Sequence, residues 1–78
     1  MIDLKQLLAD LAGAIVDHPE EVYVKASENG DTVVFELHVA ESDMGKVIGK
    51  HGKIAKSLRL VMKSAANMQN KKALVEIK

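Results

Sequence analysis

Hydrophobic positions near the start of the chain recur at the spacing of an amphipathic helix. Within residues 2–16 the apolar residues at this spacing are Ile2, Leu4, Leu7, Leu8, Leu11 and Ile15. The pattern stops at His18-Pro19, because the residue before a proline is disfavoured in the α region. We therefore expect a helix over residues 2–16 with one buried face.

Two strand-like segments follow this helix. Residues 22–26 and 32–40 are rich in β-branched residues, and the later part of the second segment alternates apolar with polar positions. Between them, residues 28–31 contain Asn29-Gly30, a dipeptide that tolerates positive φ and favours hairpin turns. The pattern predicts an antiparallel hairpin.

The second half of the chain predicts two helices and a closing strand. Ser42 is a suitable N-cap for a short helix that runs from about Asp43 to Ile48. Glycines interrupt the helical pattern, and a longer helix then runs from Lys53 to about Met68. Residues 71–78 end the chain as a strand. The order α-β-β-α-α-β indicates an α+β fold, with one domain over residues 1–78.

The longer helix has two chemically distinct sides. At 100° per residue its apolar residues fall within an arc of about 120°, which we expect to face the core; they are Ile54, Leu58, Val61, Met62, Ala65 and Met68. The opposite side is basic and consists of Lys53, Lys56, Arg59 and Lys63. No acidic residue lies on this helix to pair with these charges, so the basic side indicates an anionic partner.

The net charge of zero hides a strong asymmetry. Residues 1–43 carry two lysines against ten acidic residues, whereas residues 44–78 carry nine basic residues against one glutamate. Such asymmetry is typical of a chain with a polyanionic partner. Cysteine is absent, which excludes disulfides and thiolate chemistry. No apolar run approaches the roughly 20 residues of a membrane span, and we expect a cytoplasmic protein.

The segment over residues 47–54 combines an aliphatic pair, a Gly-x-x-Gly loop and the start of a helix. Gly49 and Gly52 permit a tight turn and the close approach of a phosphodiester. A helix N-terminus offers free N–H groups to an anion, and Lys53 at that position is favourable only if an anion is bound there. We expect these residues to bind nucleic acid: Gly45, Lys46, Ile48, Gly49, Lys50, His51, Gly52, Lys53, Ile54 and Lys56.

The stretch from Ser42 to Ile54 resembles the most characteristic stretch of type II KH domains. The resemblance covers nearly the whole chain, and it is strongest to the small bacterial proteins that consist of one KH domain, the KH domain protein A family. It implies a three-stranded mixed sheet with three helices on one face, and a groove for about four unpaired nucleotides. It also implies an RNA chaperone or post-transcriptional regulator, which in some bacteria pairs with a larger multidomain KH protein and influences cell shape. His51 departs from the Lys, Arg or Gln that is commoner at its position.

Other chemistries fit the sequence less well. Residues 45–51 nearly match a P-loop, but one spacer residue is missing and His51 replaces the Mg²⁺-binding hydroxyl. The three histidines lack the spacing of metal ligands, and no catalytic constellation is visible. We therefore expect neither an enzyme nor a protein that carries a cofactor or metal.

A protein-interaction module is the main alternative to RNA binding. Leu60 is an apolar residue inside the basic side of the long helix, and Val61 lies at the edge of the apolar arc. We expect these two residues to contact a partner, either a second copy or a larger multidomain KH protein. Single-stranded DNA is an alternative ligand for the groove.

Overall fold

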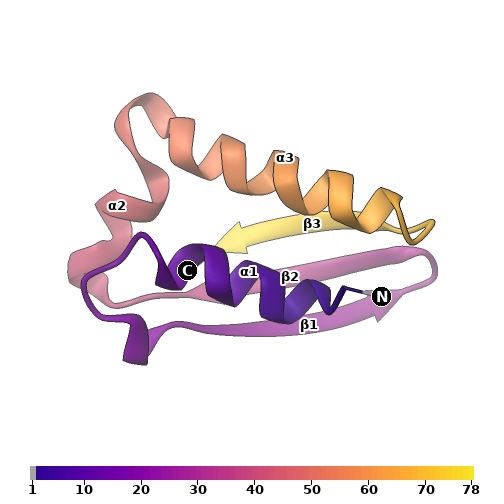
Figure 1. The fold of residues 1–78 in the computed structure, drawn as a ribbon, viewed down its shortest axis with the longest axis horizontal. Coiled ribbons are helices and arrows are strands. Elements are labelled where there is room, and N and C mark those ends of the chain that lie inside the picture. The colour runs from indigo at the N-terminus through magenta and orange to yellow at the C-terminus, as the bar shows by residue number, and fades with distance from the viewer. Residues whose placement is uncertain (1) are drawn as a thin grey trace.

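Residues 2–78 are described by a computed structural model, whose main elements follow the α-β-β-α-α-β order expected from the sequence (Figure 1). Three short 3₁₀ turns, which the pattern did not predict, occur between the main elements. None of the helices in these residues is long and apolar enough to cross a membrane. In chain order the elements are α1 (Leu4–Gly13), η1 (Pro19–Glu21), β1 (Tyr23–Asn29), β2 (Thr32–His38), η2 (Glu41–Asp43), α2 (Met44–Ile48), η3 (Lys50–Gly52), α3 (Lys53–Asn67) and β3 (Lys72–Ile77).

Helix α1 is shorter than expected at both ends. It begins after Asp3, whose carboxylate accepts a hydrogen bond from the Gln6 N–H at 3.1 Å and so caps the helix. The prediction that the helix continues to residue 16 is wrong, because α1 ends at Gly13. Pro19 instead begins η1, where its missing N–H costs no hydrogen bond.

Strands β1 and β2 form the expected hairpin, with a longer first strand. Asn29 pairs with Thr32, so that β1 extends beyond the predicted residues 22–26 and only Gly30 and Asp31 form the loop. Gly30 has φ = +65°. Glycine is favoured at the first position of a two-residue hairpin loop for this reason.

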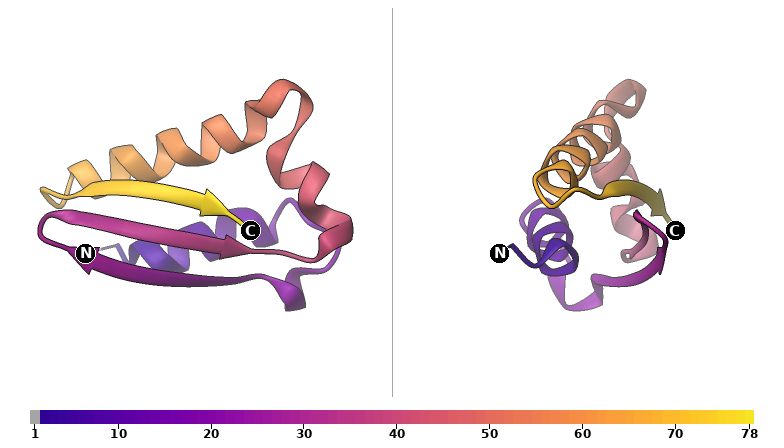
Figure 2. Two further views of the ribbon diagram at one scale, coloured as in Figure 1. Left: turned by 180° about the vertical axis from the view of Figure 1, so that it is seen from behind. Right: turned by 90° about the vertical axis from the view of Figure 1, so that its right-hand side faces the viewer.

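The sheet is mixed and has the order β1-β2-β3. β1 pairs with β2 antiparallel, and β2 pairs with β3 parallel. A parallel neighbour requires a long crossover connection, which α2 and α3 supply. β3 therefore lies at one edge of the sheet and β1 at the other (Figure 2).

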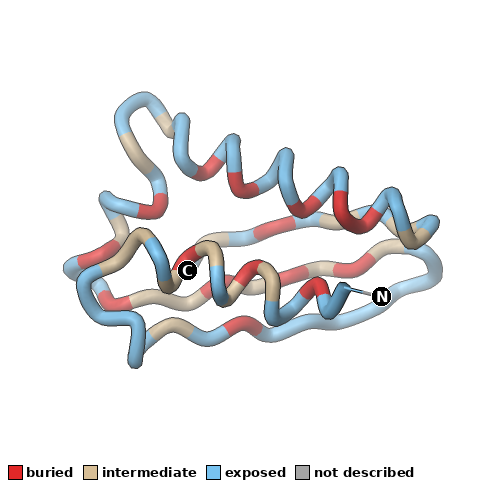
Figure 3. The backbone as a smooth tube through the Cα atoms, in the orientation of Figure 1, coloured by how far each residue is buried: buried red, intermediate tan, exposed pale blue. Residues whose placement is uncertain are grey.

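The core lies between one face of the sheet and the helices, as the resemblance implied. Alternate residues of β2 are buried, as expected for a strand with one covered face: Val33, Phe35 and Leu37. They pack against buried residues of α1 and α3, among them Leu8, Ala12, Leu58 and Met62. The opposite face of the sheet carries exposed and half-buried residues (Figure 3).

Helix α3 is rotated relative to the orientation that its periodicity predicted. Leu58, Met62 and Ala65 are buried as expected. Three other residues of the predicted apolar arc are exposed by 37%, 43% and 80%: Ile54, Val61 and Met68. Two alanines outside that arc are buried in their place: Ala55 and Ala66. Periodicity locates the arc richest in apolar residues, whereas the side of α3 that packs in the core contains these two alanines in place of the three larger residues.

Candidate nucleic-acid interface

The Gly-x-x-Gly loop connects α2 to α3, and its two glycines have different roles. Gly49 has φ = +76° and ψ = 173°, a region open essentially to glycine alone. A Cβ there would collide with the side chain of Ile54 in the first turn of α3. Gly52 has φ = +73° and ψ = 17°, but a Cβ there would meet nothing within 4 Å. Gly49 thus lets the chain turn back onto α3, whereas Gly52 leaves its backbone accessible to a ligand.

The side chains between and after the glycines are exposed lysines, a histidine and an isoleucine. Lys50, His51 and Lys53 are all exposed and lie within four residues of one another. Ile48 and Ile54 flank the loop and are also exposed. Such a surface can hold a phosphate against the loop and apolar parts of a ligand beside it.

A buried carboxylate holds α2 in place. Asp43 is 1% exposed, and its two carboxylate oxygens accept hydrogen bonds from the backbone N–H groups of Asp17 and His18, at 3.2 and 3.0 Å. The segment after α1 is thereby tied to the start of α2. The expectation that Ser42 caps this helix is wrong, because Ser42 lies inside η2 and no side chain caps α2. Asp43 is the N-cap residue of α2, but its carboxylate accepts hydrogen bonds from residues 17 and 18 and not from the helix itself.

Lys46 is bonded to acidic side chains of the same chain. Its Nζ lies 2.6 Å from Asp17 Oδ2 and 3.9 Å from Asp43 Oδ1. The hydrogen bond and charge of Lys46 lower the pKa of Asp17, and the same contact raises the pKa of Lys46. The ion pair between Lys46 and Asp17 therefore links α2 to the segment that follows α1.

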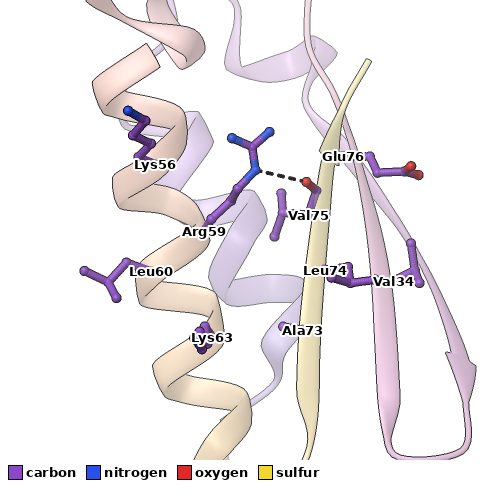
Figure 4. Close-up of a pocket in the computed structure, with 9 residues that line it drawn as sticks. All are labelled: Val34, Lys56, Arg59, Leu60, Lys63, Ala73, Leu74, Val75 and Glu76. Atoms are coloured by element: carbon purple, nitrogen blue, oxygen red, sulfur yellow. Dashed lines mark hydrogen bonds between the residues drawn. The ribbon is translucent and has the colours of Figure 1, made fainter. Parts of the chain in front are cut away.

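A groove of about 590 Å³ runs between α3 and the free edge of β3. Figure 4 shows the side chains that line it. From α3 come Lys56, Arg59, Leu60 and Lys63; from β3 come Ala73, Leu74, Val75 and Glu76; and Val34 comes from β2. Leu60 and Leu74 are exposed although they are large and apolar. The groove thus has an apolar floor beside basic side chains.

The edge of β3 in this groove has no neighbouring strand within the described chain. Arg59 Nε donates a hydrogen bond to the Val75 carbonyl oxygen at 3.3 Å, in the place where another strand would bind (Figure 4). An unpaired strand edge offers backbone donors and acceptors to a ligand. The groove can therefore form hydrogen bonds as well as apolar contacts.

The basic side of α3 is free of intramolecular ion pairs. Within residues 2–78, its four cations have no acidic group within 4.0 Å. They are Lys53, Lys56, Arg59 and Lys63. Unneutralised cations beside a groove attract an anionic ligand.

Comparison with known proteins identifies the family. A family model described as "KhpA/KhpB, KH domain" matches residues 5–77. The chain belongs to this family. The RNA-binding protein KhpA of Clostridium acetobutylicum is 50% identical over 74 residues, which cover 95% of this chain and 99% of the relative. That of Clostridium perfringens is 47% identical with the same coverage, and that of Chlamydia muridarum is 40% identical over 95% of each chain.

A solved structure shows the same fold in a larger protein. The KH fold of this chain matches Era in complex with MgGDPNP and nucleotides 1506–1542 of 16S ribosomal RNA, with a TM-score of 0.69 and 19% identity. The match covers 95% of this chain and 28% of that chain. Names of the KhpA relatives describe RNA-binding proteins and not enzymes, in agreement with the expectation from the sequence.

The structure distributes the predicted site residues of this KH domain over three places. The loop brings together Gly49, Lys50, His51, Gly52, Lys53 and Ile54, with Ile48 beside it. Lys56 lines the α3–β3 groove. Gly45 and Lys46 lie on α2, where the Lys46 ammonium is bonded to Asp17.

Sequence reasoning did not include the β3 wall of the groove in the site. Residues 73–76 face α3 only because β3 lies at the sheet edge, and nothing local in the sequence marks that position. Arg59 and Lys63 could have been found, since both belong to the basic side of α3. The two predicted partner contacts lie on different surfaces: Leu60 lines the groove and Val61 does not.

A small cluster of potential metal ligands lies far along the chain from the loop. Ligand atoms of His18, Glu20 and Glu21 lie within 4.8 Å of one another, and all three residues are exposed. The His18 and Glu20 side chains are 3.5 Å apart, which is an ordinary surface contact. Sequence spacing did not single out this cluster.

Proposed function

We propose that the protein binds about four unpaired nucleotides of RNA in the groove between α3 and β3, with the RNA backbone against the Gly-x-x-Gly loop. The observation that carries this proposal is the basic side of α3, whose cations have no acidic partner within the described residues and three of which, Lys56, Arg59 and Lys63, line the groove along the free edge of β3. Membership of the family and the names of its curated relatives support RNA as the ligand.

Two surfaces of the site contact different parts of the RNA. Lys50, His51 and Lys53 contact phosphates, which position the strand but carry no sequence information. Bases lie against Leu60 and Leu74, where the free edge of β3 can bond to their edges. The apolar floor of the groove offers no side-chain hydrogen bonds to the bases and therefore discriminates weakly between them, which suits an RNA chaperone or a post-transcriptional regulator in the cytoplasm. A single DNA strand presents the same phosphates and is the competitor to include in the test.

Charge reversal in the loop tests the proposal. In the double variant Lys50→Asp, His51→Asp both changes are at exposed positions, and Asp tolerates the left-handed conformation of residue 51 (φ = +58°). RNA affinity should fall on the order of 100-fold or more, because each charge-assisted hydrogen bond contributes about 1.5 kcal/mol or more. The measurement is fluorescence anisotropy with a labelled single-stranded RNA.

The matched control is Lys5→Asp, Gln6→Asp, which makes the same charge change on exposed positions of α1. It should bind RNA as the unmodified protein does. Circular dichroism checks that both variants are folded. Unchanged affinity in the folded loop variant would refute the proposal.

A protein-interaction role is the second candidate, and one further observation favours it. α3 carries an exposed stripe without any charged residue, formed by Ile54, Ser57, Val61, Ser64 and Met68. These residues follow a spacing of three and four, which is the pattern by which helices pack against one another. A second copy, or a larger multidomain KH protein, would cover this charge-free stripe and leave the α3–β3 groove open.

A further inference from the structure

A second recess lies at the far end of α3 from the Gly-x-x-Gly loop. It has a volume of about 520 Å³ and is lined by Lys63, Asn67, Lys71, Lys72, Ala73 and Leu74. Three of these residues, Lys63, Ala73 and Leu74, also line the α3–β3 groove. The recess therefore continues the groove toward the turn between α3 and β3.

The charges of this recess are all positive. Lys63 and Lys72 are exposed, and no acidic group of residues 2–78 lies within 4.0 Å of either ammonium. Lys71 is engaged differently, because its Nζ lies 2.7 Å from Glu28 Oε1. Lys63 and Lys72 are thus the two cations available to an anion, and the Asn67 side chain lies beside them with a further hydrogen-bond donor.

The backbone around the recess is held by hydrogen bonds. The Lys71 N–H donates to the Ala66 carbonyl oxygen at 2.9 Å, and the Lys72 N–H donates to the Asp31 carbonyl oxygen at 2.8 Å. Together with the ion pair of Lys71, these bonds fix the start of β3 against both α3 and the hairpin. Lys72 is therefore presented from a fixed backbone rather than from a free loop.

We propose that an RNA strand in the α3–β3 groove continues into this recess, where Lys63 and Lys72 bind a phosphate beyond the four nucleotides held at the loop. The inference rests on the proposed RNA binding and extends its footprint. Continuity of the two cavities favours the same RNA strand over an acidic peptide, because a strand that fills the groove leaves it at this recess. The phosphate is the recognised group, so the contact is independent of base identity.

The test compares oligouridylates of four and eight nucleotides on the full chain and on the variant Lys72→Glu. Lys72 lines the recess but not the groove, so its replacement leaves the four-nucleotide site unaltered. Lys25→Glu is the matched control, because Lys25 is also an exposed lysine on an edge strand of the same sheet. Comparing variants at one length removes the statistical advantage of the longer strand, which offers about five registers to a site for four nucleotides.

We expect Lys72→Glu to weaken binding of the eight-nucleotide strand about tenfold, and to leave binding of the four-nucleotide strand and the behaviour of Lys25→Glu unchanged. The slope of log K against log salt for the longer strand should flatten by about 0.7, the contribution of one phosphate on a single strand. Equal effects of Lys72→Glu on both lengths, or no effect on either, would overturn the extended footprint while RNA binding itself stands. If the unmodified protein binds neither strand, the proposed function fails and the extension fails with it.

Discussion

At the scale of single residues, the loop depends on backbone conformations that side chains resist. Three of its four residues have positive φ: Gly49, His51 and Gly52. Gly49 must be glycine both for its φ and ψ and because Ile54 occupies the space of a Cβ. His51 adopts the left-handed region, which histidine enters more readily than most residues. The conformation of the loop thus depends on residues that tolerate positive φ at these three positions.

The two glycines should respond differently to alanine. Gly49→Ala should destabilise the fold by about 3 kcal/mol or more, since strain at a glycine-only conformation adds to a steric clash. Gly52→Ala should cost only about 1 kcal/mol, the penalty of the left-handed conformation, because a Cβ there meets nothing within 4 Å. Urea unfolding of both variants measures the difference. Equal losses would show that Ile54 does not pack on Gly49 as described.

At the scale of elements, α2 is too short to hold its own position. It spans five residues and buries only Val47. Its placement comes from Asp43, which accepts two backbone hydrogen bonds from the segment after α1, and from the Lys46–Asp17 ion pair.

The Lys46–Asp17 pair should make stability depend on pH. The pKa of Asp17 is lowered by the hydrogen bond and charge of Lys46, so its contribution is present above the unfolded value of about 3.9 and is lost as pH falls through the folded pKa. The pKa of Lys46 is raised, so its contribution is present below about 10.4 and is lost as pH rises through the folded pKa. Asp17→Asn should therefore lower the urea midpoint slightly at neutral pH, and the difference should shrink as pH falls through the folded pKa of Asp17.

Urea titrations of the unmodified protein and Asp17→Asn at pH 2, 7 and above 11 test this pair. The effect should be small, because both side chains are exposed and water screens the charges. Asp10→Asn on α1 is the control, since no ion pair of Asp10 is found within the described residues. A difference for Asp17→Asn that does not shrink between pH 7 and pH 2 would show that its origin is not the ion pair.

At the scale of the whole molecule, folding neutralises only part of the charge asymmetry of the sequence. Three lysines of the basic half pair with acids of the acidic half: Lys46 with Asp17, Lys71 with Glu28 and Lys78 with Glu36. These pairs tie the halves together at different points of the fold. The cations along α3 do not take part, so the side of the molecule that carries the groove stays positive. The charge asymmetry therefore stabilises contacts between the two halves of the chain and also leaves a positive surface for a ligand.

Two neighbouring residues of α3 should separate RNA binding from self-association. Leu60→Asp places a negative charge in the groove and should weaken RNA binding about tenfold. Val61→Asp places a charge in the charge-free stripe and should abolish self-association, with RNA affinity unchanged within about twofold, because Val61 does not line the groove. Both residues are exposed, so both variants should fold.

Sedimentation equilibrium at high micromolar concentration, together with RNA anisotropy, measures the two effects. If the unmodified protein is a monomer under these conditions, the stripe does not join two copies. If Leu60→Asp disrupts assembly and spares RNA binding, the assignment of the two surfaces is reversed.

Local sequence determined the order of elements, the hairpin and the Gly-x-x-Gly loop. These features follow from periodicity, turn residues and backbone conformations, which depend on neighbours within a few positions. The basic side of α3 was equally visible, because one helix places residues three and four apart on the same side. Lys50 and His51 could be assigned to the loop because they lie between its two glycines, and Lys53 because it follows the second glycine directly.

Tertiary structure alone decided which surfaces those elements present. The rotation of α3 left Ile54, Val61 and Met68 exposed, and Ala55 and Ala66 are buried in their place beside Leu58 and Met62. β3 contributes a wall to the groove because it pairs on one side only, with β2. Asp17 and Lys46 are 29 residues apart in sequence, and only the fold brings their charges to 2.6 Å. In each case the deciding contact joins residues distant in sequence, and no local pattern contains that information.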